Sequence, residues 1–173
     1  MSISRIINQI RNHNDCIVLP PSGLPIIRKG LMIPKQVIDF YSVCGGLILF
    51  KSSDNCIEIL PPTDVLPSNK VILSEETYNE LLLEDELDIS MNWYTIGKYD
   101  YNEYISIDFS TDLNRAGRCY DSFHETHGIS GSNQIISKSL EELIERAFIN
   151  NGEYPYFWLR DDFESIGDAY EDY

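Results

Sequence analysis

Hydrophobic residues recur at the spacing of an α-helix in three parts of the chain. Residues 3–10 place isoleucines at positions i, i+3, i+4 and i+7, which predicts an amphipathic helix. Residues 34–43 begin with a proline, which suits a first helical turn because its missing N–H needs no partner there. A third helix is expected after Ser139, because Ser139 and Glu142 fit a capping box and apolar residues then follow at helical spacing through Phe148.

A shorter helix is expected from Ser74, a suitable N-cap, through Leu83. Its apolar side chains are expected to face inward, namely Tyr78, Leu81 and Leu82. The acidic run that follows, over residues 84–88, is typical of a solvated face or loop.

Other apolar segments are short and bounded by turn residues, as strands are. Gly45 and Gly46 are expected to end the second helix, because glycine readily takes the left-handed conformation of helix ends. The apolar run 47–50 then predicts a buried strand, and the alternating segment 56–60 predicts its hairpin partner. Further strands are expected at 16–19, 93–97, 104–109 and 117–120.

Consecutive strands, preceded and followed by helices, indicate an α+β fold with a mostly antiparallel sheet flanked by helices. The chain has 173 residues, which fits one domain. We therefore expect a single domain over residues 1–160 and an acidic C-terminal tail over residues 161–173.

The charge of the chain narrows its possible partners. There are 13 Lys and Arg residues against 28 Asp and Glu residues, a formal net charge of −15. Such a surface repels nucleic acids and anionic lipids, so we expect neither as a partner. We find no signal stretch at the start, no apolar run long enough to span a bilayer and no C-x-x-C pair among four cysteines, and we expect a cytoplasmic protein with reduced thiols.

Several motifs occur in an order that resembles the SUKH superfamily (SMI/KNR type). They are Cys44-Gly45-Gly46, Ile57-Glu58-Ile59, Trp93-x-x-Ile96-Gly97, Ile105-Ser106-Ile107-Asp108, Gly117-Arg118-Cys119-Tyr120 and Ser139-Leu140-Glu141-Glu142-Leu143-Ile144. The resemblance implies an α+β domain without enzymatic activity or cofactor. Most bacterial members resemble immunity proteins, which bind and neutralise toxin domains delivered between competing cells. Fungal members resemble regulators that act through protein contacts, so a regulatory interaction module is the alternative.

Two groups of residues are candidates for contacts with such a partner. Aromatic residues are frequent interface anchors, although they are also ordinary half-buried strand residues. Acidic residues in the tail would steer a basic, nuclease-like toxin, although a solvated tail has the same composition. The candidate partner-binding residues are Trp93, Tyr94, Tyr99, Tyr101, Asp108, Asp161, Asp162, Glu164 and Asp168. The stretch 74–88 and the tail are absent from shorter family members, and either can form or cover the binding surface.

A hydrolase is the third hypothesis, and its evidence is thin. His124 and His127 lie near Asp121 and Glu125 and resemble metal ligands, but no third spaced ligand is evident and an exposed polar loop is the favoured interpretation. Asp108, with Asp100 and Glu103 as companions, can supply acid–base chemistry, but a carboxylate that pairs across the sheet on the half-exposed polar face of the strand 104–109 is favoured. Nucleophile-elbow, zinc-protease and phosphate-loop motifs are absent from the sequence, so we expect no catalytic residue and no metal.

Overall fold

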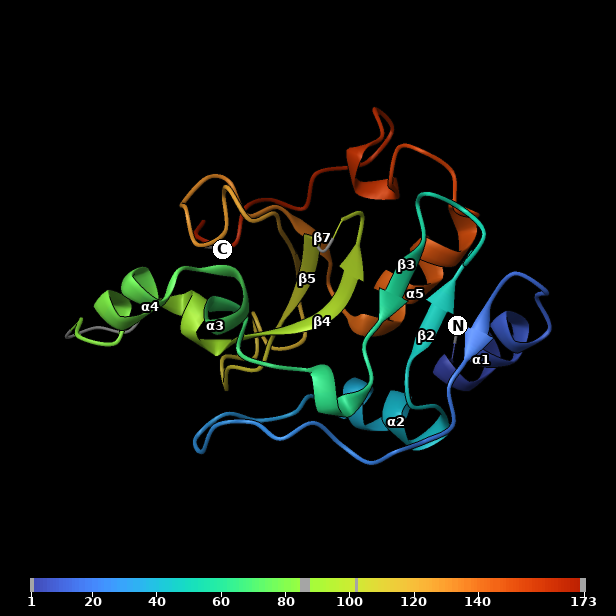
Figure 1. Cartoon of the computed structure of the whole chain (residues 1–173), viewed down its shortest axis with the longest axis horizontal. Coiled ribbons are helices and arrows are strands. Elements are labelled where there is room, and N and C mark those ends of the chain that lie inside the picture. The colour runs from blue at the N-terminus through green and yellow to red at the C-terminus, as the bar shows by residue number, and fades with distance from the viewer. Residues whose placement is uncertain (1, 85–87, 102, 172–173) are drawn as a thin grey trace.

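A seven-stranded antiparallel sheet forms the centre of the computed structural model, which describes residues 2–84, 88–101 and 103–171. The strands lie in the sheet in the order in which they occur in the chain, so each pairs with its neighbours in sequence (Figure 1). This arrangement confirms the expected α+β class and mostly antiparallel sheet. The strands are β1 (Ile17–Val18), β2 (Leu47–Leu49), β3 (Ile57–Ile59), β4 (Trp93–Tyr99), β5 (Glu103–Asp108), β6 (Cys119–Ser122) and β7 (Ile135–Ser137).

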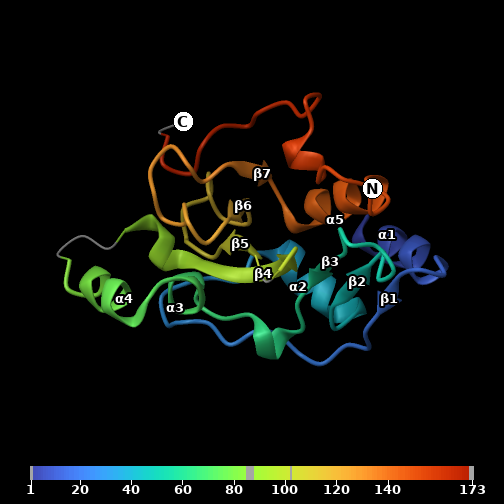
Figure 2. The same ribbon diagram turned by 45° about the horizontal axis from the view of Figure 1, so that its top comes forward.

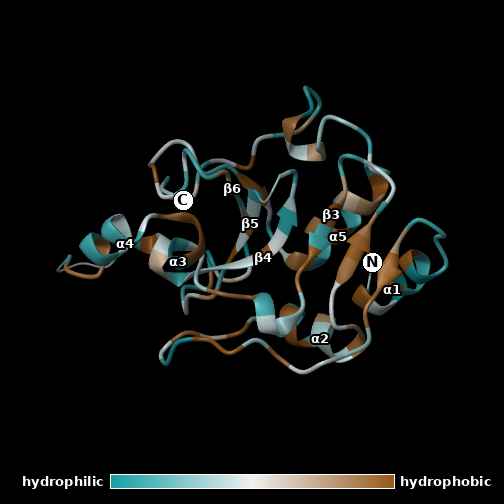
Figure 3. Ribbon diagram, viewed as in Figure 1, coloured by the Kyte–Doolittle hydropathy of each residue, from teal (hydrophilic) through white to brown (hydrophobic). Residues whose placement is uncertain are grey.

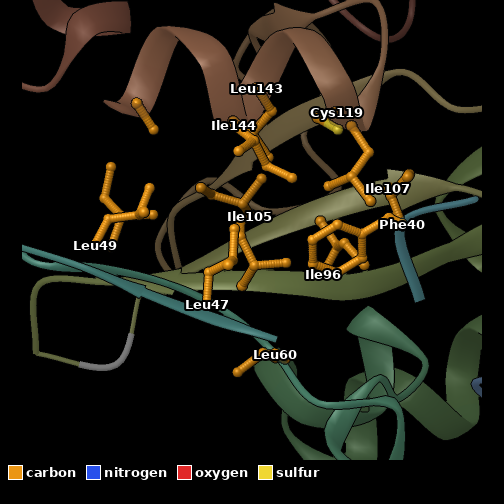
Figure 4. Close-up of a cluster of buried hydrophobic side chains, with 14 of the residues drawn as sticks. Phe40, Leu47, Leu49, Leu60, Ile96, Ile105, Ile107, Cys119, Leu143 and Ile144 are labelled. Carbon is orange, nitrogen blue, oxygen red and sulfur yellow. The ribbon is translucent and has the colours of Figure 1, made fainter. Parts of the chain in front are cut away.

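Three helices pack together and bury their apolar stripes with one face of the sheet. They are α1 (Ile3–Arg11), α2 (Lys35–Val43) and α5 (Leu140–Ile149), each where the hydrophobic pattern predicted a helix. Figure 4 shows Leu143 and Ile144 of α5 above Leu47 and Ile105 of the sheet, all within one buried cluster. Sequence-distant elements thus share one core. None of the helices in the described ranges is long and apolar enough to cross a lipid bilayer.

The N-terminus of α5 is capped much as predicted. The Ser139 side-chain oxygen accepts the Glu142 backbone N–H at 3.1 Å. The Glu142 carboxylate accepts the Lys138 N–H at 2.7 Å, one residue earlier than in a regular capping box. Two otherwise unpaired backbone donors are therefore satisfied at the point where the chain enters the helix.

The glycine pair after α2 has a different role from the one expected. Cys44 ends the helix in an extended conformation, so no left-handed residue closes it directly. A Cβ atom on Gly45 would lie 2.1 Å from the Pro20 carbonyl oxygen, and one on Gly46 would lie 2.8 Å from the Ile59 oxygen. Gly45 and Gly46 are thus required by the close approach of neighbouring backbone.

The polar face of β5 is buried, whereas the sequence predicted a half-exposed face. Ser106 and Asp108 are 0% and 1% exposed. The Ser106 hydroxyl contacts the hydroxyl oxygens of Ser68 at 2.7 Å and Ser122 at 2.6 Å. Alternation identified the two faces correctly, but it could not show that a second layer covers the polar one. That layer includes α3 (Ser68–Ile72), which the sequence analysis missed along with β7.

Helix α4 (Glu75–Leu81) also departs from expectation. Ser74 caps it, because its side-chain oxygen accepts the Thr77 N–H at 3.2 Å. None of its residues is fully buried. Tyr78 and Leu81 are half-buried, as the inner side of the helix, whereas Leu82 in the following turn is exposed, so the predicted inward face is wrong at Leu82. In Figure 1 α4 projects from the body beyond α3. Residues 85–87 of the acidic run lie outside the described residues.

The described part of the chain also contains three short 3-10 helices: η1 (Pro62–Asp64), η2 (Ile89–Asn92) and η3 (Phe157–Leu159). After η3 the chain runs as an irregular segment above β7 and β6 toward the C-terminus (Figure 2). We call residues 157–171, which include η3, the C-terminal strap.

Candidate functional site

The candidate aromatic residues lie mainly in the core. Trp93, Tyr94 and Tyr99 are 0%, 2% and 6% exposed, so their rings are unavailable to a partner in this conformation. Trp93 packs against the Tyr120 ring with 4.5 Å between centroids. Tyr101 differs from them, since it is 94% exposed. The expected aromatic contact surface is therefore reduced to one residue.

Hydrogen bonds explain why the hydroxyl groups of Tyr94 and Tyr99 can be buried. The Tyr94 hydroxyl accepts the Arg28 backbone N–H at 2.9 Å, and the Tyr99 hydroxyl donates to the Asp121 carboxylate. Asp108 is likewise committed inside the fold, because its carboxylate accepts the Ser110 N–H at 2.7 Å. These buried groups stabilise the sheet, so a partner would contact other side chains at the surface.

The acidic residues of the strap divide into two kinds. Asp161, Asp162 and Glu164 are exposed, whereas Asp168 is buried. The Asp168 carboxylate accepts backbone N–H groups from Gly131 at 3.0 Å, Asn133 at 2.6 Å and Tyr170 at 3.0 Å. Asp168 therefore holds the strap to the body, whereas Asp161, Asp162 and Glu164 face solvent.

Backbone pairing extends this attachment. The Ile135 N–H donates to the Gly167 oxygen at 2.9 Å, and the Ala169 N–H donates to the Asn133 oxygen at 2.9 Å. Gln134 and Asp168 form an isolated antiparallel bridge beside β7. The strap thereby covers the edge of the sheet, where unpaired backbone groups would otherwise invite pairing with another chain.

The start of the strap is anchored by Trp158, which is buried. Its indole N–H donates to the Asp121 carboxylate at 3.1 Å, and its ring stacks on Tyr156 with 4.9 Å between centroids. Burial raises the pKa of Asp121, although the hydrogen bonds from Tyr99 and Trp158 favour its charged form. The strap is thus fixed at both ends.

Between α5 and the strap lies an open groove of about 570 Å³. We call it the strap groove, and its lining residues are Arg146, Ile149, Asn150, Phe157, Arg160, Asp162, Phe163 and Glu164. Ile149 is 73% exposed, which is unusual for a large apolar side chain beside an aromatic surface. Exposed apolar surface that lines a groove is a feature of ligand-binding and protein-binding sites.

The two arginines of the groove are already paired within the chain. The Arg146 guanidinium lies 5.4 Å from the Phe163 ring centroid, and it contacts the Glu142 carboxylate at 2.7 Å. Arg160 contacts Asp162 at 3.1 Å. Glu164 is the other carboxylate that lines the groove, and it is exposed. Aromatic and arginine side chains beside exposed charge are typical of protein-binding hot spots.

The histidine pair does not form one site. The His127 Nε2 atom contacts the Asn69 side-chain oxygen at 2.7 Å, and burial lowers the pKa of His127 to about 4. His124 is exposed, and its Nδ1 atom contacts Glu103 at 2.5 Å. Within the described ranges, no group of three or more His, Cys, Asp or Glu side chains is placed to hold a metal ion.

The sequence analysis missed the α5 side of the groove. Ile149 is the last residue of α5 and lies outside the helical spacing of the buried apolar residues of that helix. This position in the sequence indicates that its side chain is exposed. Phe163 stood out only as an aromatic residue inside an acidic tail. Ile149 and Phe163 lie close together because of the path of the strap, and local sequence patterns do not encode that path.

Comparisons with known proteins give one informative match. No protein-family model and no solved structure matches the chain. The chain is 39% identical over 171 residues to the immunity protein YokJ of Bacillus subtilis (strain 168), and the match covers 99% of this chain and 97% of that protein. The match spans nearly the whole of both chains. The protein therefore belongs to the family of the immunity protein YokJ.

Proposed function

We propose that this protein is a cytoplasmic immunity protein of the SUKH type, which binds a cognate toxin domain and blocks it by contact, without catalysis. The observation that carries the proposal is the strap groove, lined by the exposed Ile149 and the half-buried Phe163, in a chain 39% identical to an immunity protein. Immunity by binding needs a preformed complementary surface, and the groove is fixed by α5 on one side and an anchored strap on the other.

The groove supplies two different contributions to binding. Ile149 and Phe163 offer apolar area, whose removal from water stabilises a complex by about 25 cal/mol per Å². The exposed carboxylates of the strap beside the groove, Asp161, Asp162 and Glu164, supply negative charge, which raises the rate of association with a positively charged partner. Tyr101 lies in the turn between β4 and β5, and its contact with the partner stays a prediction.

The partner that fits this surface is a basic toxin domain. The net charge of −15 repels other acidic proteins and attracts cationic ones. A nuclease is the expected kind of toxin, because an enzyme that binds a polyanion carries a positively charged surface. An acidic protein bound over that surface would exclude the nucleic acid.

The test is co-expression with the toxin domain encoded by the neighbouring gene. We expect the wild-type chain to restore growth of cells that produce the toxin and to co-purify with it. Ile149→Lys should weaken both effects, because it removes apolar contact and places a cation against a basic partner.

The matched control is Ile26→Lys, since Ile26 is a 91% exposed isoleucine in the loop before α2. It should protect cells as the wild-type chain does. Absence of both rescue and co-purification by the wild-type chain would refute the proposed function. Equal effects of the two lysine variants would refute the assignment to the strap groove.

A further inference from the structure

We infer that α4 and the turn after it, residues 75–84, form a second contact surface for a basic protein partner. This inference rests on the proposed function, because the partner is the toxin domain. We call residues 75–84 the α4 tip. Figure 1 shows α4 projecting at one end of the molecule, and Figure 3 shows it hydrophilic with a hydrophobic turn after it.

The α4 tip contributes little to the protein's own core. No residue of α4 is buried, and the helix has only seven residues. A helix this short is marginal in water without tertiary packing. Its support comes from the Ser74 cap and from Glu75 and Glu76 in the first turn, where negative charge favours the helix.

The chemistry of the α4 tip is specific. Residues 75–84 contain four glutamates, Glu75, Glu76, Glu80 and Glu84, and no lysine or arginine. The turn after the helix presents Leu83, which is 84% exposed, and Leu82, which is 47% exposed. Glu76, Glu80 and Leu83 are spaced at i, i+4 and i+7, and the Leu83 N–H donates to the Glu80 oxygen at 3.0 Å, so the turn continues the coil of the helix.

The charge of the α4 tip indicates which kind of partner can bind this acidic surface and its exposed leucine. A second copy of this chain would bring four further carboxylates against these four, and such like charge opposes association. A cationic surface with an apolar recess fits instead. Leu83 then supplies a desolvated anchor, and the glutamates around it supply attraction and a polar rim.

The apolar contribution is tested with two leucines of nearly equal exposure. Leu83→Asp removes the apolar anchor while adding a charge that favours a basic partner. Leu113→Asp makes the same change at a leucine that is 86% exposed in the β5–β6 loop. With purified toxin domain, we expect Leu83→Asp to raise the dissociation constant at least about tenfold, as loss of a hot spot does, and Leu113→Asp to change it less than about twofold.

The charge contribution is tested by association kinetics. Glu76→Gln combined with Glu80→Gln should slow association at low salt, and the difference should shrink at high salt because ions screen exposed charges. Asp54→Asn combined with Glu125→Gln removes two exposed carboxylates elsewhere on the surface and is the control. We expect a smaller effect of the control pair.

The outcomes separate this inference from the proposed function. If the wild-type chain binds the toxin domain and Leu83→Asp and the α4 glutamine pair each match their control, the α4 surface is refuted while the proposed function stands. If the wild-type chain does not bind, both are refuted. Circular dichroism of each variant shows that it folds, and the glutamine pair tests the surface without changing any apolar residue.

Discussion

Asn133 donates its backbone N–H to the Asp168 carboxylate across 2.6 Å, and this hydrogen bond joins the C-terminal strap to the segment before β7. The two residues are separated by 35 positions in the sequence. In addition, the backbone N–H of Ala169 donates to the Asn133 oxygen at 2.9 Å. An acidic residue in a tail-like sequence is therefore a structural acceptor. The position of the strap, and with it one wall of the strap groove, depends on this attachment.

Asp168→Ala should loosen the strap. The substitution leaves three backbone N–H groups without their carboxylate acceptor, and loss of such acceptors costs about 2–3 kcal/mol of stability in total. Urea unfolding measures the change in free energy, and hydrogen exchange should show faster exchange at residues 131–135 and 167–170. Glu164→Ala, at an exposed position of the same strap, should change stability by less than about 0.5 kcal/mol. Equal effects of the two variants would contradict the anchoring role.

His127 should make the fold sensitive to acid. Burial lowers the pKa of its imidazole from 6.5 to about 4, so the unfolded chain binds a proton more readily than the native state does. Stability contributed by neutral His127 is present above pH 6.5 and is lost as the pH falls toward 4, with about 3 kcal/mol as the upper limit. Asp88 opposes this shift by favouring the protonated form.

The measurement is the free energy of unfolding from pH 7 to pH 4 in the wild-type chain and in His127→Gln. Glutamine retains an N–H donor for Asn69 but does not titrate. The wild-type chain should lose more stability than the variant over this range. Burial raises the pKa of Asp121 and gives the opposite slope, and it does so in both proteins, so their difference isolates His127. Parallel curves would show that His127 is not the titrating group.

Gly45→Ala should destabilise the fold by about 1–3 kcal/mol, because a methyl group at this position meets the Pro20 carbonyl oxygen and the backbone must move. Gly131→Ala is a useful comparison, since its φ of +81° carries strain but no atom lies within 4 Å of the added Cβ. Thermal unfolding of both variants distinguishes crowding from backbone strain. A Gly45→Ala protein as stable as the wild type would exclude the close approach.

The sequence was sufficient to predict the elements whose packing is local. Isoleucines at helical spacing predicted α1, and the capping residues Ser74 and Ser139 marked the starts of α4 and α5. It was insufficient wherever a distant segment adds a layer. Alternation in β5 placed Asp108 on a polar face, but the segments that bury this face come from other parts of the chain.

The same distinction applies to the candidate site. Asp161, Asp162 and Glu164 were identified from composition, and all three are exposed on the strap. The aromatic residues of β4 were identified from residue type alone, which does not distinguish an interface anchor from a core residue. Ile149 became a candidate only when the strap brought Phe163 beside the end of α5.

Calorimetric titration of the purified toxin domain into the purified chain measures whether the strap groove binds that domain. We expect a stoichiometric complex with the wild-type chain and with Ile26→Lys. We expect at least about tenfold weaker binding by Ile149→Lys, equivalent to about 1.4 kcal/mol. Unchanged affinity of Ile149→Lys, or no heat of binding with the wild-type chain and the toxin domain of the neighbouring gene, would contradict binding at the strap groove.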